Sequence, residues 1–256
     1  MPSTIRIGTI AGARFEAHFS WIIALALMVG TLAFGWLPQV APDLSPTADL
    51  LLGVVGAMLF FALALAHDLG HVLGARYRER TLTRTVLYPW GGVYTLEEPV
   101  TPTDEAQVAL GGPLLSLAIG VAASLLIPLY YTSSTWIALL TTVQYTSILL
   151  GLVNLLPGLP LDMGHVLRGF LRTQREVATP RTPAPPDAEH VLRYHSIREH
   201  RDANEIAWLV GRVIAAGLLL WGIVQAATGH GIAALWLIGV GIALLAQPGP
   251  ASPVAA

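Results

Sequence analysis

Long apolar stretches separated by short polar connections run through most of this chain, and they predict how it folds. An apolar helix of about 20 residues is long enough to cross the hydrocarbon core of a bilayer. The pattern therefore predicts an all-α polytopic membrane protein with six transmembrane helices. The first stretch also has the position of a secretory signal, but its length and the lack of a clear small-x-small cleavage site favour a retained helix. The six stretches are Phe19–Leu37, Leu50–Ala75, Ala106–Tyr130, Trp136–Leu156, Ile206–Ala227 and Ile232–Ala246.

The segments around these stretches have different patterns. The alternation at Thr4–Ile10 predicts a short strand or an interfacial arm. Residues 81–98 predict a small β hairpin on the cytoplasmic side or at the interface, with Pro89 keeping it at a sheet edge. Thr103 or Asp104 is expected to cap the third helix. We expect an N-terminal arm at 1–18, a membrane core at 19–171, a Pro- and Arg-rich cytoplasmic linker or flap at 172–204, two further helices at 205–247 and a disordered tail at 248–256.

Composition supports a membrane protein and narrows its chemistry. Hydrophobic residues make up 54% of the chain and charged residues 12%, whereas an ordinary soluble domain has about 25% charged residues. The net charge of −2 gives no overall basic surface for nucleic acid. Because the chain has no cysteine, a metal ion would need His, Asp or Glu ligands.

The basic residues predict an orientation in the cell membrane. All 14 are arginines, and they lie in the N-terminal arm, in the loop after the second stretch, at 168–201 and at Arg212. By the positive-inside rule, both termini and both long loops are cytoplasmic. His67, His71 and Asp162 then lie near the cytoplasmic ends of the second and fourth spans, so they can share one site on that side.

The segment His67-Asp68-Leu69-Gly70-His71 ends the second apolar stretch. Two histidines four residues apart on a helix project about 40° from each other, close enough to bind one metal ion. Ordinary helix packing explains an isolated pair equally well, but ionisable groups in an apolar helix are costly and usually functional. A catalytic zinc ion takes three protein ligands and an open position for water, and His67, His71 and Asp162 supply that number. Asp68 occupies the position of the glutamate that acts as general base in HExxH motifs.

The chain resembles the site-2 proteases, a family of intramembrane zinc metalloproteases, and specifically their compact prokaryotic branch with a six-helix core. The resemblance rests on the order and topology of five segments and covers most of the chain. They are Ile5–Gly8, His67–His71 with HDLGH in place of the usual HExxH, Pro89–Gly92, Gly111–Pro113 and Asn154–Gly164.

The resemblance implies a function and a set of site residues. It implies one Zn²⁺ per chain, bound by His67, His71 and Asp162, and catalytic roles for Asp68 and Asn154, the latter positioning the substrate or its oxyanion. It also implies that the hairpin presents an edge strand to the substrate, with Gly91, Gly92, Val93 and Asn154 as substrate-binding residues. The expected substrates are transmembrane segments of membrane proteins, such as a membrane-anchored regulator.

The edge-strand role also has a physical basis of its own. A transmembrane helix satisfies its backbone hydrogen bonds internally, so a protease must unwind it before cleavage. Pairing the unwound segment with the hairpin at Leu87–Thr95 would replace the lost hydrogen bonds. A hairpin that only packs against the helices is the alternative. The three residues Gly111–Pro113 are expected to allow close helix packing beside the site. His165 is expected to lie beside the metal ligands or at the membrane interface instead of binding metal itself.

Other functions stay open at this stage. Asp68 is one methylene shorter than glutamate, which is compatible with an active enzyme, with an attenuated or inactive relative that binds membrane partners, or with an engineered change. A membrane di-iron desaturase or hydroxylase also uses HxxxH, but it needs more histidines and usually HxxHH pairs, which this chain lacks. A transporter would be expected to show repeated halves with broken helices. The physiological substrate and the oligomeric state do not follow from the sequence.

Overall fold

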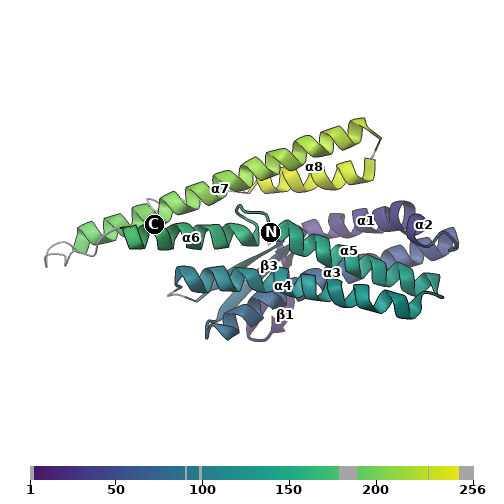
Figure 1. Cartoon of the computed structure of the whole chain (residues 1–256), viewed down its shortest axis with the longest axis horizontal. Helices are drawn as coiled ribbons and strands as arrows, with labels where there is room; N and C mark the ends of the chain where they lie inside the picture. The colour runs from purple at the N-terminus through teal and green to yellow at the C-terminus, as the bar shows by residue number, and fades with distance from the viewer. Residues whose placement is uncertain (1–2, 90, 98–99, 179–188, 230, 248–256) are drawn as a thin grey trace. The chain divides into compact units, whose positions relative to one another are not determined.

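A computed structural model describes residues 3–89, 91–97, 100–178, 189–229 and 231–247, with only the backbone described for 175–178, 189–201, 232 and 233 (Figure 1). The chain divides into two compact units. The first comprises Met1–Glu98 and Leu110–Leu155, and the second Pro99–Ala109 and Leu156–Ala256. The long helix α4 contributes its first residues to the second unit and the rest to the first.

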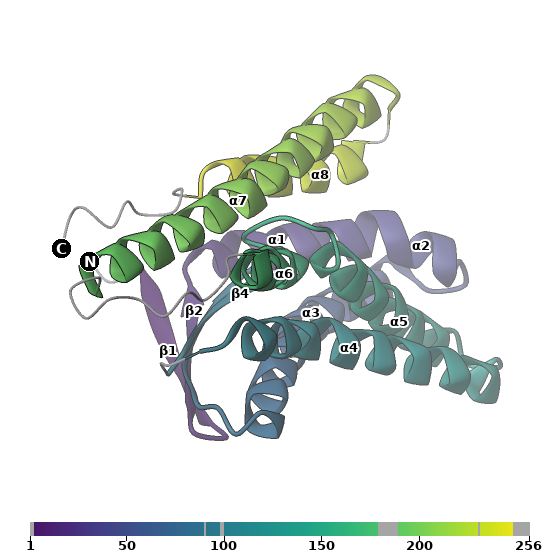
Figure 2. The ribbon, with the colours of Figure 1, turned by 60° about the vertical axis from the view of Figure 1, so that its left-hand side comes forward.

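The helices of the first unit follow the predicted apolar stretches. The first stretch forms α1 (Ser20–Thr31), a π-helical turn η1 (Leu32–Trp36) and the short α2 (Leu37–Val40). The next three stretches form α3 (Pro46–Tyr77), α4 (Pro102–Leu126) with the 3₁₀ turn η2 (Ile127–Tyr130), and α5 (Ser134–Asn154). In Figures 1 and 2, α3, α4 and α5 lie side by side. A core cluster of Leu32, Leu37, Ala41 and Ala138 packs η1 and α2 against α5.

Side-chain caps define where two of these helices begin. Ser45 Oγ accepts a hydrogen bond from the backbone N–H of Ala48 at 3.2 Å, which caps α3. At α4, Thr101 Oγ1 accepts from the N–H of Asp104 at 3.1 Å, and the Asp104 carboxylate accepts from the N–H of Thr101 at 3.3 Å. The prediction of Thr103 or Asp104 as the cap is therefore wrong by two or three residues. Pro102 at the first helical position favours this earlier start.

The β element is a four-stranded sheet instead of a single hairpin. Its strands, in spatial order, are β1 (Thr4–Ile10), β2 (Ala13–His18), β3 (Leu82–Tyr88) and β4 (Gly91–Leu96). Ala11 and Gly12 both have positive φ, 53° and 88°, as the tight turn of a hairpin requires. The N-terminal arm is thus a hairpin, and β2 pairs with β3 in parallel. Pro89 lies in the turn after β3, and the edge strands of the described sheet are β1 and β4.

An ion pair joins the two parallel strands. Arg84 donates from Nη2 to Oε2 of Glu16 at 2.6 Å and from Nε to Oε1 at 3.1 Å. These hydrogen bonds, with a further one from Thr4, hold the pKa of the Glu16 carboxyl below its ordinary value.

The second unit contains three further helices, α6 (Asp162–Ala178), α7 (Glu189–Ala227) and α8 (Gly231–Leu245). The predicted linker at 172–204 is therefore helical at both ends, while its proline-rich middle lies outside the described residues, as does the predicted tail at 248–256. α8 has 15 residues, about 22 Å of helix, compared with about 30 Å for a hydrocarbon core. Five helices of the described chain are long and apolar enough to cross a membrane, so the count of six spans is not confirmed.

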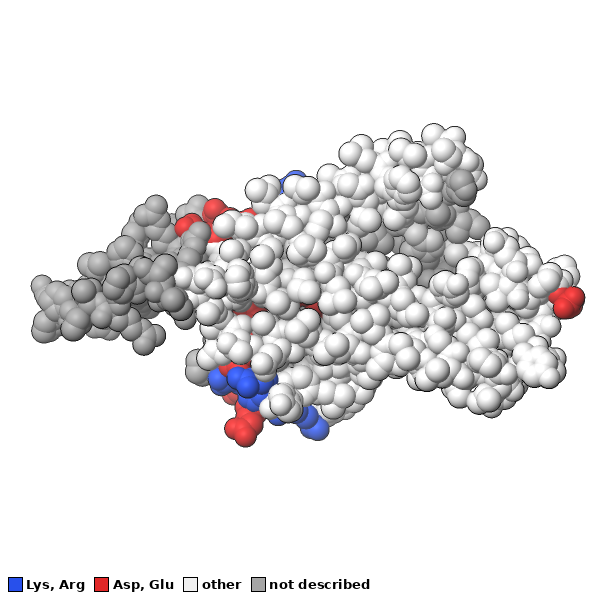
Figure 3. Space-filling view, viewed as in Figure 1, with Lys and Arg blue, Asp and Glu red and all other residues white. Residues whose placement is uncertain are grey.

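The helices of the first unit present an apolar surface. Leu125 is 72% exposed, Leu149 63% and Leu114 62%. In Figure 3 the surface of these helices carries little acidic or basic colour between two charged regions, one near the sheet and an acidic patch at the opposite end of the helices. Such a surface suits a hydrocarbon environment.

Candidate metal centre

Helix α3 carries a buried group of three side chains near its C-terminal end. His67, Asp68 and His71 are 1%, 2% and 0% exposed. One ligand atom from each lies within 4.8 Å of the others. The two histidines are four residues apart, so one turn of α3 presents both to the same neighbour. Their rings lie edge to face, with centroids 5.0 Å apart.

Gly112 on α4 shows where the two histidines point. A Cβ atom added at Gly112 would overlap the Nε2 atoms of both His67 and His71. Both Nε2 atoms therefore converge beside the backbone of α4, at a place where any side chain would displace them. Two imidazole nitrogens in this arrangement suit a zinc ion, which binds His nitrogens at about 2.0–2.1 Å and tolerates a carboxylate in the same set.

The approach of α4 to α3 depends on a pair of glycines. A Cβ at Gly70 would overlap the carbonyl oxygen of Gly111, and a Cβ at Gly111 would overlap that of Gly70. The two backbones are therefore in direct contact one residue away from His71 and Gly112. The predicted close helix packing at Gly111–Pro113 is confirmed.

Two neighbours of the histidines were not predicted from the sequence. Ser116 of α4 is 1% exposed, and its Oγ lies 2.9 Å from Nδ1 of His67. The ring of Tyr94 in β4 lies 4.8 Å from that of His71, measured between centroids. Ser116 follows Gly112 by four residues, so both lie on the same face of α4. Once Gly112 is known to contact the histidines of α3, this spacing identifies Ser116 as a further neighbour.

The carboxylate of Asp68 lies against the edge strand. A Cβ added at Gly92 would overlap both carboxylate oxygens of Asp68, so the acid occupies the space that a side chain of β4 would otherwise fill. A small pocket opens beside this contact. It is lined by Ala64, His67, Asp68, Leu87, Tyr88, Pro89, Gly91, Gly92 and Leu150.

Asn154 lies beside the first residue of the same strand, next to the contact between Asp68 and Gly92. It is 1% exposed, and its Nδ2 donates to the carbonyl oxygen of Leu150 at 2.9 Å. A Cβ at Gly91 would lie 3.3 Å from Oδ1 of Asn154. The structure thus brings Asp68, Gly91, Gly92 and Asn154 together in the first unit, while the side chain of Val93 is 47% exposed.

Asp162 lies in the second unit, as the first residue of α6, and is 4% exposed. The loop before it packs tightly on α7: the N–H of Leu159 donates to Ala207 O at 3.0 Å, and a Cβ at Gly158 would lie 2.5 Å from Cα of Gly211. The position of Asp162 within its unit is therefore well defined. Its role as a third metal ligand stays a prediction.

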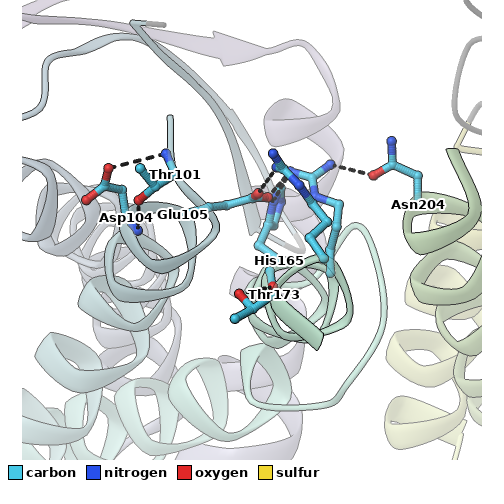
Figure 4. A network of polar contacts seen from close by, with 9 residues as sticks. Thr101, Asp104, Glu105, His165, Thr173 and Asn204 are labelled. Atoms are coloured by element: carbon cyan, nitrogen blue, oxygen red, sulfur yellow. Dashed lines mark hydrogen bonds and ion pairs between the residues drawn. The ribbon is translucent and has the colours of Figure 1, made fainter. Parts of the chain in front are cut away.

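The second unit has a buried polar cluster of its own, the Glu105 cluster (Figure 4). Glu105 of α4 ion-pairs with Arg168 and Arg172 of α6, and His165 Nδ1 lies 3.1 Å from its Oε1. Arg168 also donates to Asn204 of α7 at 3.2 Å. The cluster ties α6 to α4 and α7, and His165 faces Glu105 there.

Comparisons with known proteins find relatives that are named zinc metalloproteases. No family model matches the chain. The chain is 35% identical over 175 residues to "Putative zinc metalloprotease sll0528" of Synechocystis, covering 67% of this chain and 45% of that protein. It is 29% identical over 248 residues to "Putative zinc metalloprotease Rip3" of Mycobacterium tuberculosis, covering 94% and 56%. It is 27% identical over 171 residues to "Zinc metalloprotease MJ0392" of Methanocaldococcus jannaschii, covering 67% and 46%.

The chain spans about half the length of the curated relatives it matches. A solved structure, "Site-2 Protease from Methanocaldococcus jannaschii", has the same fold, with a TM-score of 0.60 at 20% identity over 97% of this chain and 98% of that one. The relatives of the chain are named zinc metalloproteases, the chain has the fold of a site-2 protease, and an apolar helix carries a buried His-Asp-His group. The chain therefore belongs to the site-2 protease family.

Proposed function

We propose that the chain is a zinc-dependent intramembrane endopeptidase that cleaves transmembrane segments of membrane proteins. The observation that carries the proposal is the convergence of the two Nε2 atoms of His67 and His71 beside Gly112, with the Asp68 carboxylate buried next to them. These groups lie on α3, which is long and apolar enough to cross a membrane.

The proposed metal centre holds one Zn²⁺ per chain. His67 and His71 supply two nitrogen ligands, and Asp162 is the proposed third, on the resemblance of the Asn154–Gly164 segment to the family. When bound, zinc acts as a Lewis acid that activates water and polarises the scissile carbonyl. The residues of the chain then have to place the substrate and move protons.

Asp68 is the proposed general base. Its carboxylate is buried beside the two histidines and Gly92. It is proposed to accept a proton from water and pass it to the leaving amine, and both groups must then lie within hydrogen-bond distance of the carboxylate. Asn154 is proposed to position the substrate near Gly91 at the start of β4, where its Oδ1 lies, with the second N–H of its Nδ2 as the donor to the substrate carbonyl. Both roles place the reacting peptide bond at the end of β4 that faces Asp68.

The edge strand β4 is the proposed substrate-binding element. Gly92 contacts the Asp68 carboxylate, so a substrate strand paired along Gly91, Gly92 and Val93 would run next to the proposed base. Proline at position 92 or 93 should abolish cleavage and leave zinc bound. Cleavage at the wild-type rate by both proline variants would exclude strand pairing at β4.

The direct test compares three proteins with zinc quantified in each: the wild type, Asp68→Glu and Asp68→Ala. Each is purified, reconstituted and given a transmembrane substrate. We expect Asp68→Ala to keep zinc and to lose at least about 100-fold in cleavage rate, the lower range for a general base. Equal cleavage by wild type and Asp68→Ala would show that Asp68 is not the base.

An attenuated relative is the second candidate, and the length of Asp68 favours it. A carboxylate one methylene shorter than glutamate and packed on Gly92 has little freedom to reach further. Such a protein would bind zinc and a transmembrane segment without forming product, and Asp68→Glu would raise cleavage. Metal analysis separates both candidates from a di-iron oxygenase, which would hold two irons instead of one zinc.

The proposed location is the cell membrane, with the metal centre and both termini on the cytoplasmic side. The absence of cysteine makes this simple to test. A single cysteine introduced at Glu79, after α3, should react with a membrane-impermeant thiol reagent only from the cytoplasmic side. A cysteine at Thr132, between η2 and α5, should react from the opposite side, and the reverse pattern would invert the proposed topology.

A further inference from the structure

The hydroxyl of Ser116 lies against one ring nitrogen of His67 while the other ring nitrogen takes part in the metal centre. Ser116 Oγ is 2.9 Å from Nδ1 of His67, and both residues are buried. Gly112, one turn earlier on the same face of α4, borders Nε2 of His67. α4 therefore frames His67 at two points, with a hydroxyl at Nδ1 and bare backbone at Nε2.

The protonation of His67 decides whether it can bind a metal ion. A neutral imidazole carries a proton on one nitrogen and a lone pair on the other. With the proton on Nδ1, the ring donates to Ser116 Oγ and keeps its Nε2 lone pair directed toward the place where His71 Nε2 also points. With the proton on Nε2, that lone pair is lost to the metal centre. An acceptor at Nδ1 favours the first arrangement and fixes the plane of the ring.

We propose that Ser116 is a positioning residue for the metal centre: it accepts the Nδ1–H of His67 and so holds the tautomer and ring orientation that present Nε2 to zinc. The inference rests on the proposed function, because it requires His67 to be a zinc ligand. Ser116 itself contacts neither zinc nor substrate, and it acts through His67 alone.

The test measures zinc affinity on the full chain in detergent, with zinc alone as the probe and a chromogenic chelator as competitor. Ser116→Ala should weaken zinc binding by about 10–100-fold, the range for losing such an outer partner. Ser116→Thr keeps the hydroxyl and should restore most of the affinity. The matched control is Ser124→Ala on the same helix. The Ser124 hydroxyl donates to the carbonyl oxygen of Gly120 at 2.8 Å, and its removal should leave zinc affinity unchanged.

The melting temperature of the metal-free proteins separates positioning from folding. If Ser116→Ala melts like the wild type and binds zinc as tightly, the inference is overturned. If Ser116→Ala does not fold, Ser116→Thr decides, and a folded Thr variant with weakened zinc binding also overturns it. Failure of the proposed function looks different: the wild type binds no zinc, or His67→Ala and His71→Ala bind it as tightly as the wild type.

Discussion

Among the described residues, the group His67, Asp68 and His71 on α3 and the Glu105 cluster differ in what compensates their charge. Glu105 is met by Arg168, Arg172 and His165, so protein groups balance its carboxylate. The group on α3 gathers two imidazoles and a carboxylate, a donor set that suits a cation such as zinc. The carboxylate of Glu105 is therefore balanced by protein groups, whereas the group on α3 is compatible with binding a metal ion.

The two clusters also differ in whether side chains or main chain form their contacts. Arginine side chains of α6 reach Glu105, so the contacts of that cluster are made by side chains. Around the α3 group, Gly112 borders the histidine nitrogens and Gly92 borders Asp68, so main chain replaces side chain at both contacts. We therefore expect the metal centre to fail when a methyl group is added and the Glu105 cluster to fail when a charge is removed.

The largest effect is expected from removing a histidine of the metal centre. His67→Ala or His71→Ala should weaken zinc binding by more than about 100-fold, beyond the range for an outer partner, and abolish cleavage. The measurement is metal content after dialysis. His165→Ala, which alters the Glu105 cluster instead, should retain one zinc per chain. Loss of zinc from His165→Ala to the same extent would remove the distinction between the two clusters.

Breaking the Glu105 cluster should affect stability most. Glu105→Ala removes the carboxylate that balances Arg168 and Arg172. Breaking a fully buried pair costs about 3–5 kcal/mol, and we expect a loss of up to about 3 kcal/mol because these arginine side chains are 25% and 15% exposed. Denaturant unfolding in detergent measures the loss. The double variant Glu105→Ala with Arg168→Ala should lose less than the sum of the single variants, because the two side chains act on one interaction. Additive losses would show that the pair is not coupled.

A single added methyl group should damage the metal centre. Gly112→Ala places Cβ where Nε2 of both histidines now lies, so the rings must move apart, and we expect zinc affinity to fall at least about tenfold, or about 1.4 kcal/mol. The control is Gly217→Ala in α7, where an added Cβ meets nothing within 4 Å. Unchanged zinc affinity in Gly112→Ala would mean that the histidines do not converge beside α4.

Local sequence patterns predicted the parts of this molecule that depend on local forces. Apolar length predicted α3, α4 and α5, because a helix of that composition satisfies its own backbone wherever it lies. The spacing of His67 and His71 placed both on one face of α3 for the same reason. Resemblance to the family, and not local pattern, suggested Asn154 and the glycines of β4.

Contacts between distant segments could not be predicted in this way. Ser116 meets His67 across 49 residues, and no local pattern marks it among the serines of an apolar helix. The parallel pairing of Phe15 with Thr85 joins strands separated by four helical segments, α1, η1, α2 and α3. Helix α6 was not predicted as one element: residues 162–171 were assigned to the membrane core, and 172–178 to the linker because arginines and the following prolines gave them that composition. In the structure, Arg168 and Arg172 ion-pair with Glu105.

The smallest effect concerns a charge pair outside both clusters. Arg84 lowers the pKa of Glu16 from its ordinary 4.5, so this pair stabilises the sheet above the ordinary pKa and loses that contribution as the pH falls through the lowered one. Glu16→Gln should therefore be less stable than the wild type near neutral pH, and the difference should shrink in acid. Thermal unfolding from pH 7 to about pH 3 measures it. A difference that stays constant with pH would show that Arg84 stabilises the strands by packing, without help from the carboxylate charge.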